Sequence, residues 1–187
     1  MIQIRSGVFE TNSSSTHSIC IPKKTNKIDT FVEFRFGEYG WENRRVDDTP
    51  SYLYTAIMNA YYDEDTRDSK IEKLKSILND HSIGYSFEKP KWDDSYGYKY
   101  LDSGYVDHAE ETRGFIDAIL NDEDMLFRYL FDGVVYTGND NQDADPSGCD
   151  IYDAYYWKYE NDDDYKVKKI PNPYHDEENY DYFYKGN

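Results

Sequence analysis

Tyrosine supplies much of the apolar material from which this chain can build a core. The chain has only 13 Ile, 7 Leu and 7 Val, and with 9 Phe these make up 36 of its 187 residues. A highly charged sequence with so few aliphatic residues tends towards disorder. The 21 Tyr and 3 Trp change this expectation, because each ring buries a large apolar area and keeps a polar group at its edge. We therefore expect a folded domain with a tyrosine-rich core and surface.

Charge is the second constraint. The chain has 38 Asp and Glu against 21 Lys and Arg, a formal net charge of −17. Residues 1–46 are close to neutral, so residues 47–187 carry a net charge of −19. Such a surface repels nucleic acid and anionic membranes and attracts proteins whose working face holds phosphates. We expect no direct nucleic-acid binding, no membrane contact, and a binding protein more readily than an enzyme.

The hydrophobic pattern predicts an α+β fold with a mixed or antiparallel sheet, since strands come first, then helices, then strands again. Expected strands lie at 2–5, 17–21, 31–36, 83–88, 134–137 and 165–170. About four helices are expected, starting at the N-cap Thr49, near 66–68, after a capping box from Asp107 to Glu110, and after Asn121 or Asp122. We assign residues 1–171 to one α+β domain and 172–187 to a flexible acidic, tyrosine-rich tail.

Cysteine spacing and hydropathy argue against several classes of protein: zinc-ribbon, thioredoxin-like, membrane-spanning and secreted proteins. Cys20 and Cys149 form no C-x-x-C pair, so neither a zinc ribbon nor a thioredoxin-type motif is indicated. Cys20 lies in an apolar run and is expected to be a buried free thiol. No apolar run approaches the ~20 residues that span a bilayer, and the first residues lack a signal-peptide pattern. We expect a soluble, intracellular protein without a cofactor.

A loop rich in hydroxyl groups precedes the strand at 17–21. Residues 10–18 contain six Ser and Thr residues and one histidine. Hydroxyl and backbone donors can hold a phosphate, and a serine beside a histidine can act as nucleophile and base. Neither a G-x-S-x-G elbow nor a glycine-rich phosphate loop is present. The competing interpretation is a polar connection whose hydroxyls bind their own backbone. The candidate ligand-binding residues here are Ser13, Ser14, Ser15 and His17.

A second polar loop follows the strand at 134–137. Its candidate ligand-binding residues are Thr137, Asn139 and Asn141. If both loops meet, an enzyme or binding protein for a nucleotide or a phosphorylated ligand becomes possible, with Ser14, His17 and Asp140 as its catalytic residues. Asp143, Asp145 and Asp150 are spaced loosely like calcium ligands, but Ala144 stands where such a loop needs glycine. We therefore predict an acidic, solvated turn rather than a metal site.

Both polar loops belong to stretches that resemble a known group of proteins. The stretches are VFETNSSSTHS at 8–18 and VYTGNDN at 135–141. They are similar to segments of small phage, mobile-element and Firmicutes proteins without an assigned function. The resemblance brings no activity with it, but it implies a phage or mobile-element context, and with it a location in the cytoplasm of a bacterial host cell. Small acidic proteins in that context are often inhibitors of host defence, including anti-CRISPR proteins.

Four clusters combine acidic and aromatic residues, and they supply the candidate partner-binding residues. These are Tyr61, Tyr62, Asp63, Glu64 and Asp65; Trp92, Asp93 and Asp94; Tyr155, Tyr156 and Trp157; and Asp162, Asp163 and Asp164. Carboxylates can occupy an Arg and Lys groove that normally holds phosphates, and aromatic side chains can anchor the contact. The simpler interpretation is a solvated face that keeps the protein soluble. The leading hypothesis is an inhibitor that blocks a basic nucleic-acid-binding protein, most specifically an RNA-guided nuclease.

Overall fold

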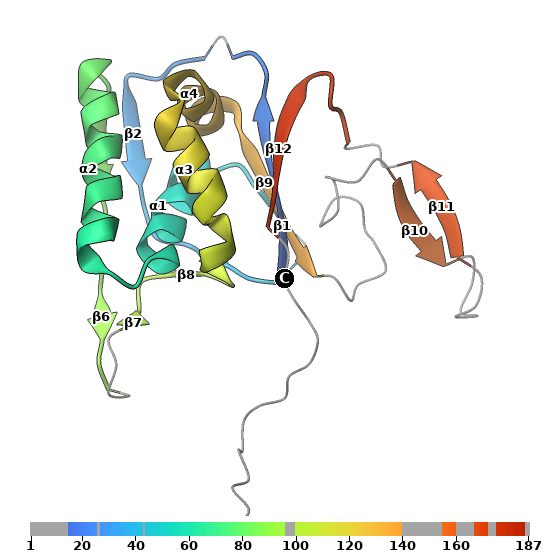
Figure 1. Cartoon of the computed structure of the whole chain (residues 1–187), viewed down its shortest axis with the longest axis horizontal. Helices are drawn as coiled ribbons and strands as arrows, with labels where there is room; N and C mark the ends of the chain where they lie inside the picture. Colours follow the sequence, from blue (N-terminus) through green and yellow to red (C-terminus); the bar gives the residue numbers. More distant parts are fainter. Residues whose placement is uncertain are drawn as a thin grey trace, which may run out of the picture.

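The centre of the molecule is a four-stranded antiparallel sheet with strand order β12–β1–β9–β4 (Figure 1). The computed structural model describes residues 15–25, 27–42, 44–95, 100–139, 155–159, 167–171 and 175–185. The strands are β1 (Ser15–Pro22), β4 (Arg44–Val46), β9 (Val134–Asn139) and β12 (Tyr180–Lys185). Seven of the eight residues of β1 are buried, because it lies between two partner strands and is covered on both faces.

The other described strands form pairs. Two pairs are parallel, β2 (Phe31–Phe34) with β5 (Gly84–Phe87) and β3 (Glu38–Tyr39) with β8 (Tyr105–Val106). Two pairs are antiparallel, β6 (Trp92–Asp93) with β7 (Tyr100–Leu101) and β10 (Tyr155–Tyr159) with β11 (Val167–Pro171). The combination of these strands with separate helices confirms the α+β class.

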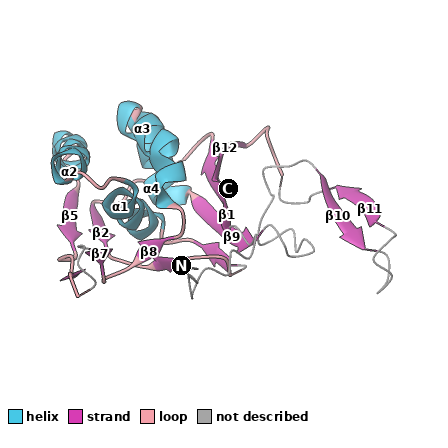
Figure 2. Ribbon diagram, turned by 60° about the horizontal axis from the view of Figure 1, so that its bottom comes forward, coloured by secondary structure: helices cyan, strands magenta, loops and turns pink. Residues whose placement is uncertain are grey.

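Four α-helices are present in the described residues, as the sequence predicts. They are α1 (Thr49–Ala60), α2 (Glu64–Asp80), α3 (Arg113–Asn121) and α4 (Glu123–Asp132), with a short 3-10 helix, η1 (Ala109–Thr112), before α3. Figure 2 shows α2, α3 and α4 gathered on one side of the strands, with α1 closest to them. Ten of the twelve residues of α1 are buried, so this helix is the centre of the hydrophobic core.

Aspartates cap three of the four helices. The side chains of Asp48, Asp63 and Asp122 accept hydrogen bonds from backbone amides in the first turns of α1, α2 and α4, at 3.3, 2.8 and 3.0 Å. The expected cap of α1 at Thr49 is therefore wrong by one residue. The expected capping box from Asp107 is also wrong, because the chain there turns through a left-handed residue, His108 (φ 48°), into η1.

The core is rich in aromatic rings, as the composition predicts. Tyr52 and Tyr129 are fully buried. The rings of Phe34 and Phe87 stack with centroids 4.5 Å apart and join β2 to β5. Each buried aromatic ring removes a large apolar area from water. Aromatic packing thus replaces part of the aliphatic core that the sequence lacks.

The C-terminal segment differs from the sequence prediction. Residues 180–185, which we placed in a flexible tail, form β12 and pair with β1 from Tyr180 opposite Pro22 to Lys185 opposite His17. Phe183 packs its ring against Phe115 of α3 at 5.5 Å between centroids. The alternating aromatic residues of this segment favour a strand, and this preference outweighs its terminal position and its acidic charge.

Two smaller expectations concern Cys20 and the hydropathy. Cys20 is a buried free thiol, as predicted, and burial raises the pKa of this thiol far above its usual value. Among the described helices, none combines the length and the apolar character that a membrane crossing requires.

Candidate functional site

Two of the four acidic–aromatic clusters meet at one cavity. The end of α1, the turn before α2 and the β6–β7 pair enclose a cavity of about 380 Å³. Its lining residues are Met58, Asn59, Tyr61, Tyr62, Arg67, Trp92, Tyr100 and Leu101. Figure 1 shows β6 and β7 beside the N-terminal end of α2. We call this cavity, together with the neighbouring acids Asp63, Glu64, Asp65, Asp93 and Asp94, the acidic–aromatic groove.

Arg67 holds the two sides of the groove together. Its guanidinium lies 4.7 Å from the centroid of the Trp92 ring, and its Nη1 donates to the carbonyl oxygen of Tyr61 at 3.3 Å. The side chain is buried, with only 8% of Arg67 exposed. A cation over an indole face is attracted by the ring quadrupole. Arg67 therefore fixes Trp92 in position while adding little positive charge to the exposed surface.

The two adjacent tyrosines at the groove have different environments. Tyr61 is half-buried between Lys70 and Arg113, which lie 5.6 and 5.5 Å from its ring centroid. Burial, with a further contribution from Asp117, raises the pKa of Tyr61 to about 12. Tyr62, by contrast, is 86% exposed. Tyr61 is thus part of the packed structure, and Tyr62 is the aromatic side chain available to a partner.

Hydrogen bonds stabilise the charged form of two acids of the groove, Asp93 and Asp63. Asp93 accepts hydrogen bonds from the amide of Ser95 at 2.7 Å and from the hydroxyl of Tyr100 at 2.8 Å, and these bonds lower its pKa. Hydrogen bonds from the hydroxyl and the amide of Thr66 likewise lower the pKa of Asp63. Glu64 and Asp65 follow in the first turn of α2, where the helix dipole favours negative charge.

The two polar loops are brought together by the central sheet. Ser15 lies opposite Asn139 and His17 lies opposite Thr137 in the β1–β9 register, and opposite residues of an antiparallel pair have Cα atoms about 5 Å apart. The loops therefore satisfy the proximity that a shared site requires. However, Ser15, His17 and Thr137 are at most 1% exposed. Ser13, Ser14, Asp140 and Asn141 lie outside the described residues.

Both ring nitrogens of His17 have partners inside the core. Nε2 donates to the carbonyl oxygen of Gly40 at 3.0 Å, and Nδ1 lies 2.9 Å from the hydroxyl of Tyr52. Thr137 Oγ1 donates to the carbonyl oxygen of Glu42 at 2.6 Å. The side chains of His17 and Thr137 thus connect the central sheet to the segment before β4 and to α1.

The remaining predicted residues lie largely outside the structure that is described. Tyr155, Tyr156 and Trp157 belong to β10, for which only the backbone is described. The acids Asp162, Asp163 and Asp164 lie outside the described ranges, as do Asp143, Asp145 and Asp150. Within the described ranges, no group of three or more His, Cys, Asp or Glu side chains is arranged to hold a metal ion.

Sequence reasoning missed two residues that shape the groove. Arg67 follows the cap Asp63 by four positions, a spacing that puts both on one side of α2, and this signal could have placed it at the groove. Tyr100 is brought to Asp93 by the β6–β7 pair, which is too short to show a strand pattern.

Comparison with known proteins gave no matching family model, and no similar curated protein or solved structure. The functional argument therefore rests on the residues of this chain.

Proposed function

We propose that the protein is an acidic inhibitor of phage or mobile-element type that binds and blocks a basic nucleic-acid-binding protein of host defence. An RNA-guided nuclease is the partner that we propose to test first, which would place its action in the bacterial cytoplasm. The observation that carries the proposal is the meeting of two acidic–aromatic clusters at one groove. The two clusters are about 30 residues apart in the sequence, and the sequence alone does not show that they lie side by side.

The chemistry of the groove fits a partner that normally holds phosphates. Five acids adjoin the lining residues Tyr62 and Trp92 in the sequence. Among the described residues, the one lining cation, Arg67, is buried against Trp92. Two further cations, Lys70 and Arg113, lie against the ring of Tyr61. Arg side chains bind carboxylates and phosphates with the same paired hydrogen bonds. The acids would therefore occupy positions that a nucleic-acid backbone takes in the partner, and the partner's channel would be closed to DNA or RNA.

Aromatic and apolar side chains of the groove would add the short-range part of the contact. Tyr62 is the most exposed large apolar side chain in the described residues, and Met58 and Leu101 line the cavity beside it. Charge attraction speeds association, whereas buried aromatic anchors carry most of the binding energy at protein interfaces. We therefore expect Tyr62→Ala to weaken binding about tenfold or more without unfolding the protein.

The direct test measures blocking of DNA binding. Purified protein is added to a guide-loaded RNA-guided nuclease, and binding of fluorescent target DNA is followed at ~0.1 and ~0.5 M NaCl. The proposal predicts that the protein displaces DNA, and that its own binding to the nuclease weakens at the higher salt concentration. A complex that is insensitive to salt would contradict phosphate mimicry, and failure to bind any nuclease would remove this partner.

A matched pair of triple variants distinguishes the effect of the groove's carboxylates on blocking from the effect of net charge alone. Glu64→Gln, Asp65→Asn and Asp94→Asn remove three exposed carboxylates at the groove. The control, Asp80→Asn, Asp122→Asn and Glu123→Gln, removes three at the other end of α2, about 25 Å away along a 17-residue helix. His81 of that end contacts Glu123 at 2.9 Å. We expect about tenfold weaker blocking for the first variant and a change within about twofold for the second. Equal losses would contradict a specific groove.

A further inference from the structure

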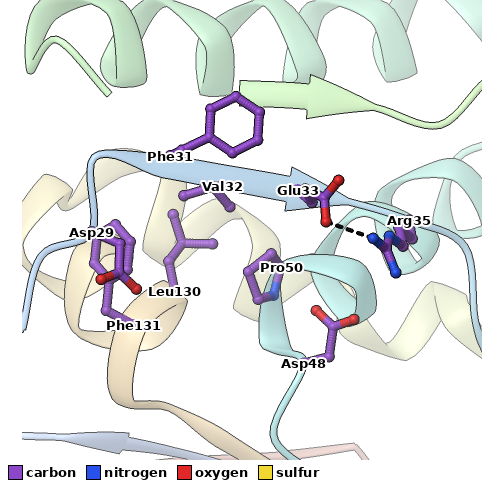
Figure 3. A pocket seen from close by; sticks show the side chains of 9 residues that line it. All are labelled: Asp29, Phe31, Val32, Glu33, Arg35, Asp48, Pro50, Leu130 and Phe131. Atoms are coloured by element: carbon purple, nitrogen blue, oxygen red, sulfur yellow. Dashed lines mark hydrogen bonds and ion pairs between the residues drawn. The ribbon is translucent and has the colours of Figure 1, made fainter. Parts of the chain in front are cut away.

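A second groove lies along one edge of β2, away from the acidic–aromatic groove. Its cavity of about 350 Å³ is lined by Asp29, Phe31, Val32, Glu33, Arg35, Asp48, Pro50, Leu130 and Phe131. Figure 3 shows Leu130 from the end of α4 and Pro50 from the start of α1 directed towards the strand. We call this cavity the β2 groove. It has an apolar wall on the helix side and a strand on the other.

Among the described residues, the strand edge that faces this groove has backbone hydrogen-bonding groups with no hydrogen-bond partner. The carbonyl oxygens of Thr30 and Phe34 accept hydrogen bonds from the β5 side at 2.8 and 2.9 Å. Because peptide groups alternate along a strand, those of Phe31 and Glu33 point to the opposite edge. In the described residues β2 pairs with β5 and with no other strand. At the end of that edge the amide of Arg35 donates to the hydroxyl of Ser51 in α1 at 3.1 Å.

The charges around the groove are mainly negative. Asp29 and Glu33 each form an ion pair with a basic residue two positions away, at 3.4 and 2.6 Å. Asp48 has no ion pair among the described residues, and its carboxylate accepts a hydrogen bond from the amide of Ser51. A lysine or arginine side chain entering the groove would therefore meet an unneutralised carboxylate next to an apolar wall, which suits both its charge and its long aliphatic stem.

We propose that the β2 groove binds an extended, basic peptide segment of a partner protein, which adds as a strand to the free edge of β2. The backbone groups of Phe31 and Glu33 supply the hydrogen bonds, as in other cases of strand addition to a sheet edge. Leu130, Phe131 and Pro50 accept alternate apolar side chains, and Asp48 pairs with a basic one. This site is independent of the acidic–aromatic groove and of the function proposed for it.

The probe is a fluorescent, acetylated hexapeptide with valine, valine and lysine at alternate positions, so that all three side chains lie on one face of the added strand, and with threonine at the other positions. Its binding to the full chain is followed by anisotropy. A second peptide carries N-methyl groups on alternate residues, which removes its hydrogen-bond donors on one edge and changes nothing in the protein. We expect saturable binding of the first peptide and about tenfold weaker binding of the second. A third peptide, in which glutamate replaces lysine, should not bind.

Protein variants test the same contacts from the other side. Asp48→Asn removes the charge and keeps the helix cap, because Asn caps as well as Asp, and it should weaken the lysine peptide about fivefold. Glu33→Pro removes a backbone amide that points away from β5, a change that an edge strand tolerates, and it should weaken binding of the lysine peptide about tenfold. Glu33→Gln removes the charge of Glu33 but keeps its amide, so comparing the two variants separates the effect of the charge from that of the hydrogen bond. Asp122→Asn and Asp63→Asn are matched cap controls expected within about twofold. The proposal would be overturned if N-methylation of the peptide or Asp48→Asn left the affinity unchanged, or if the lysine peptide did not bind at ~1 mM.

Discussion

His17 illustrates how a residue suited to catalysis can serve the core instead. It is fully buried, and its two nitrogens are joined to Tyr52 and to the backbone of Gly40. Removal of the imidazole would leave a cavity and two buried polar groups without their partner, and both effects destabilise a fold.

We therefore predict that His17→Ala lowers the free energy of unfolding by about 2–4 kcal/mol. Tyr52→Phe, which removes only the hydroxyl, should lower it by about 1–2 kcal/mol. Urea denaturation at neutral pH measures both. His81→Ala is the control: the side chain of His81 is 45% exposed and its Nε2 lies 2.9 Å from the exposed carboxylate of Glu123, so a change below about 1 kcal/mol is expected. If His17→Ala left the free energy of unfolding unchanged, the structural role would be contradicted and a direct role of His17 in ligand chemistry would again be the better explanation.

Asp93 offers a second prediction about a single side chain, in this case about pH. Its hydrogen bonds lower its pKa in the folded state, so the stability it contributes is complete above its unfolded pKa of about 3.9 and is lost as the pH falls through the lowered folded value. NMR titration of its carboxyl carbon should give a pKa below 3.9, an ordinary Asp value. Tyr100→Phe removes one donor and should move the pKa of Asp93 upwards. An unchanged pKa in this variant would show that the hydroxyl does not stabilise the charge.

At the level of helices and strands, β12 is the element whose contribution is most easily tested. Phe183 lies against Phe115, and the neighbouring Asp181 accepts from Nη1 of the buried Arg128 at 3.1 Å. Phe183→Ala should lower the free energy of unfolding by about 2 kcal/mol, less than a fully buried phenylalanine because Phe183 is half-buried. Thermal denaturation compares it with Tyr62→Ala, which removes an exposed ring and should be nearly neutral. Equal stability of both variants would contradict a structural role for β12.

The elements that the sequence predicts well are those with local signals. α1, α2 and α4 have a capping aspartate followed by helical periodicity, and β9 is a run of β-branched and aromatic residues, so each is found within a few residues of its expected bounds. The two-residue strands β3, β6, β7 and β8 have no local signal. β3 and β8 lie far apart in the sequence and are brought side by side by the core. β6 and β7 form a local hairpin, in which Trp92 lies under the guanidinium of Arg67.

The candidate site shows the same division. The acidic–aromatic clusters are visible in the sequence because their members are consecutive, but their meeting at one groove depends on the turn between α1 and α2 and on the β6–β7 pair. The β2 groove was not predicted at all. Its residues come from β2, α1 and α4, and an unpaired strand edge can be recognised only when the pairing of every neighbouring strand is known.

For the molecule as a whole, net charge opposes folding and favours association with a basic partner. A formal charge of −17 on 187 residues produces repulsion that the unfolded chain relieves by expansion. The same charge attracts a basic protein from a distance. Salt screens both effects, so the two should respond to it in opposite directions.

Raising NaCl from ~0.1 to ~1 M shortens the Debye length from about 10 to about 3 Å. We predict that the Tm of the free protein rises over this range, because repulsion between carboxylates is screened, while the Kd for its basic partner increases. The variant Glu64→Gln, Asp65→Asn and Asp94→Asn should show a smaller change in both quantities, whereas the control at the other end of α2 should show the smaller change in Tm alone. That contrast distinguishes carboxylates that only destabilise the fold by repulsion from carboxylates that also contact the partner. A Tm that falls with NaCl would mean that internal ion pairs, such as those of Arg128 with Asp124 and Asp181, outweigh the repulsion.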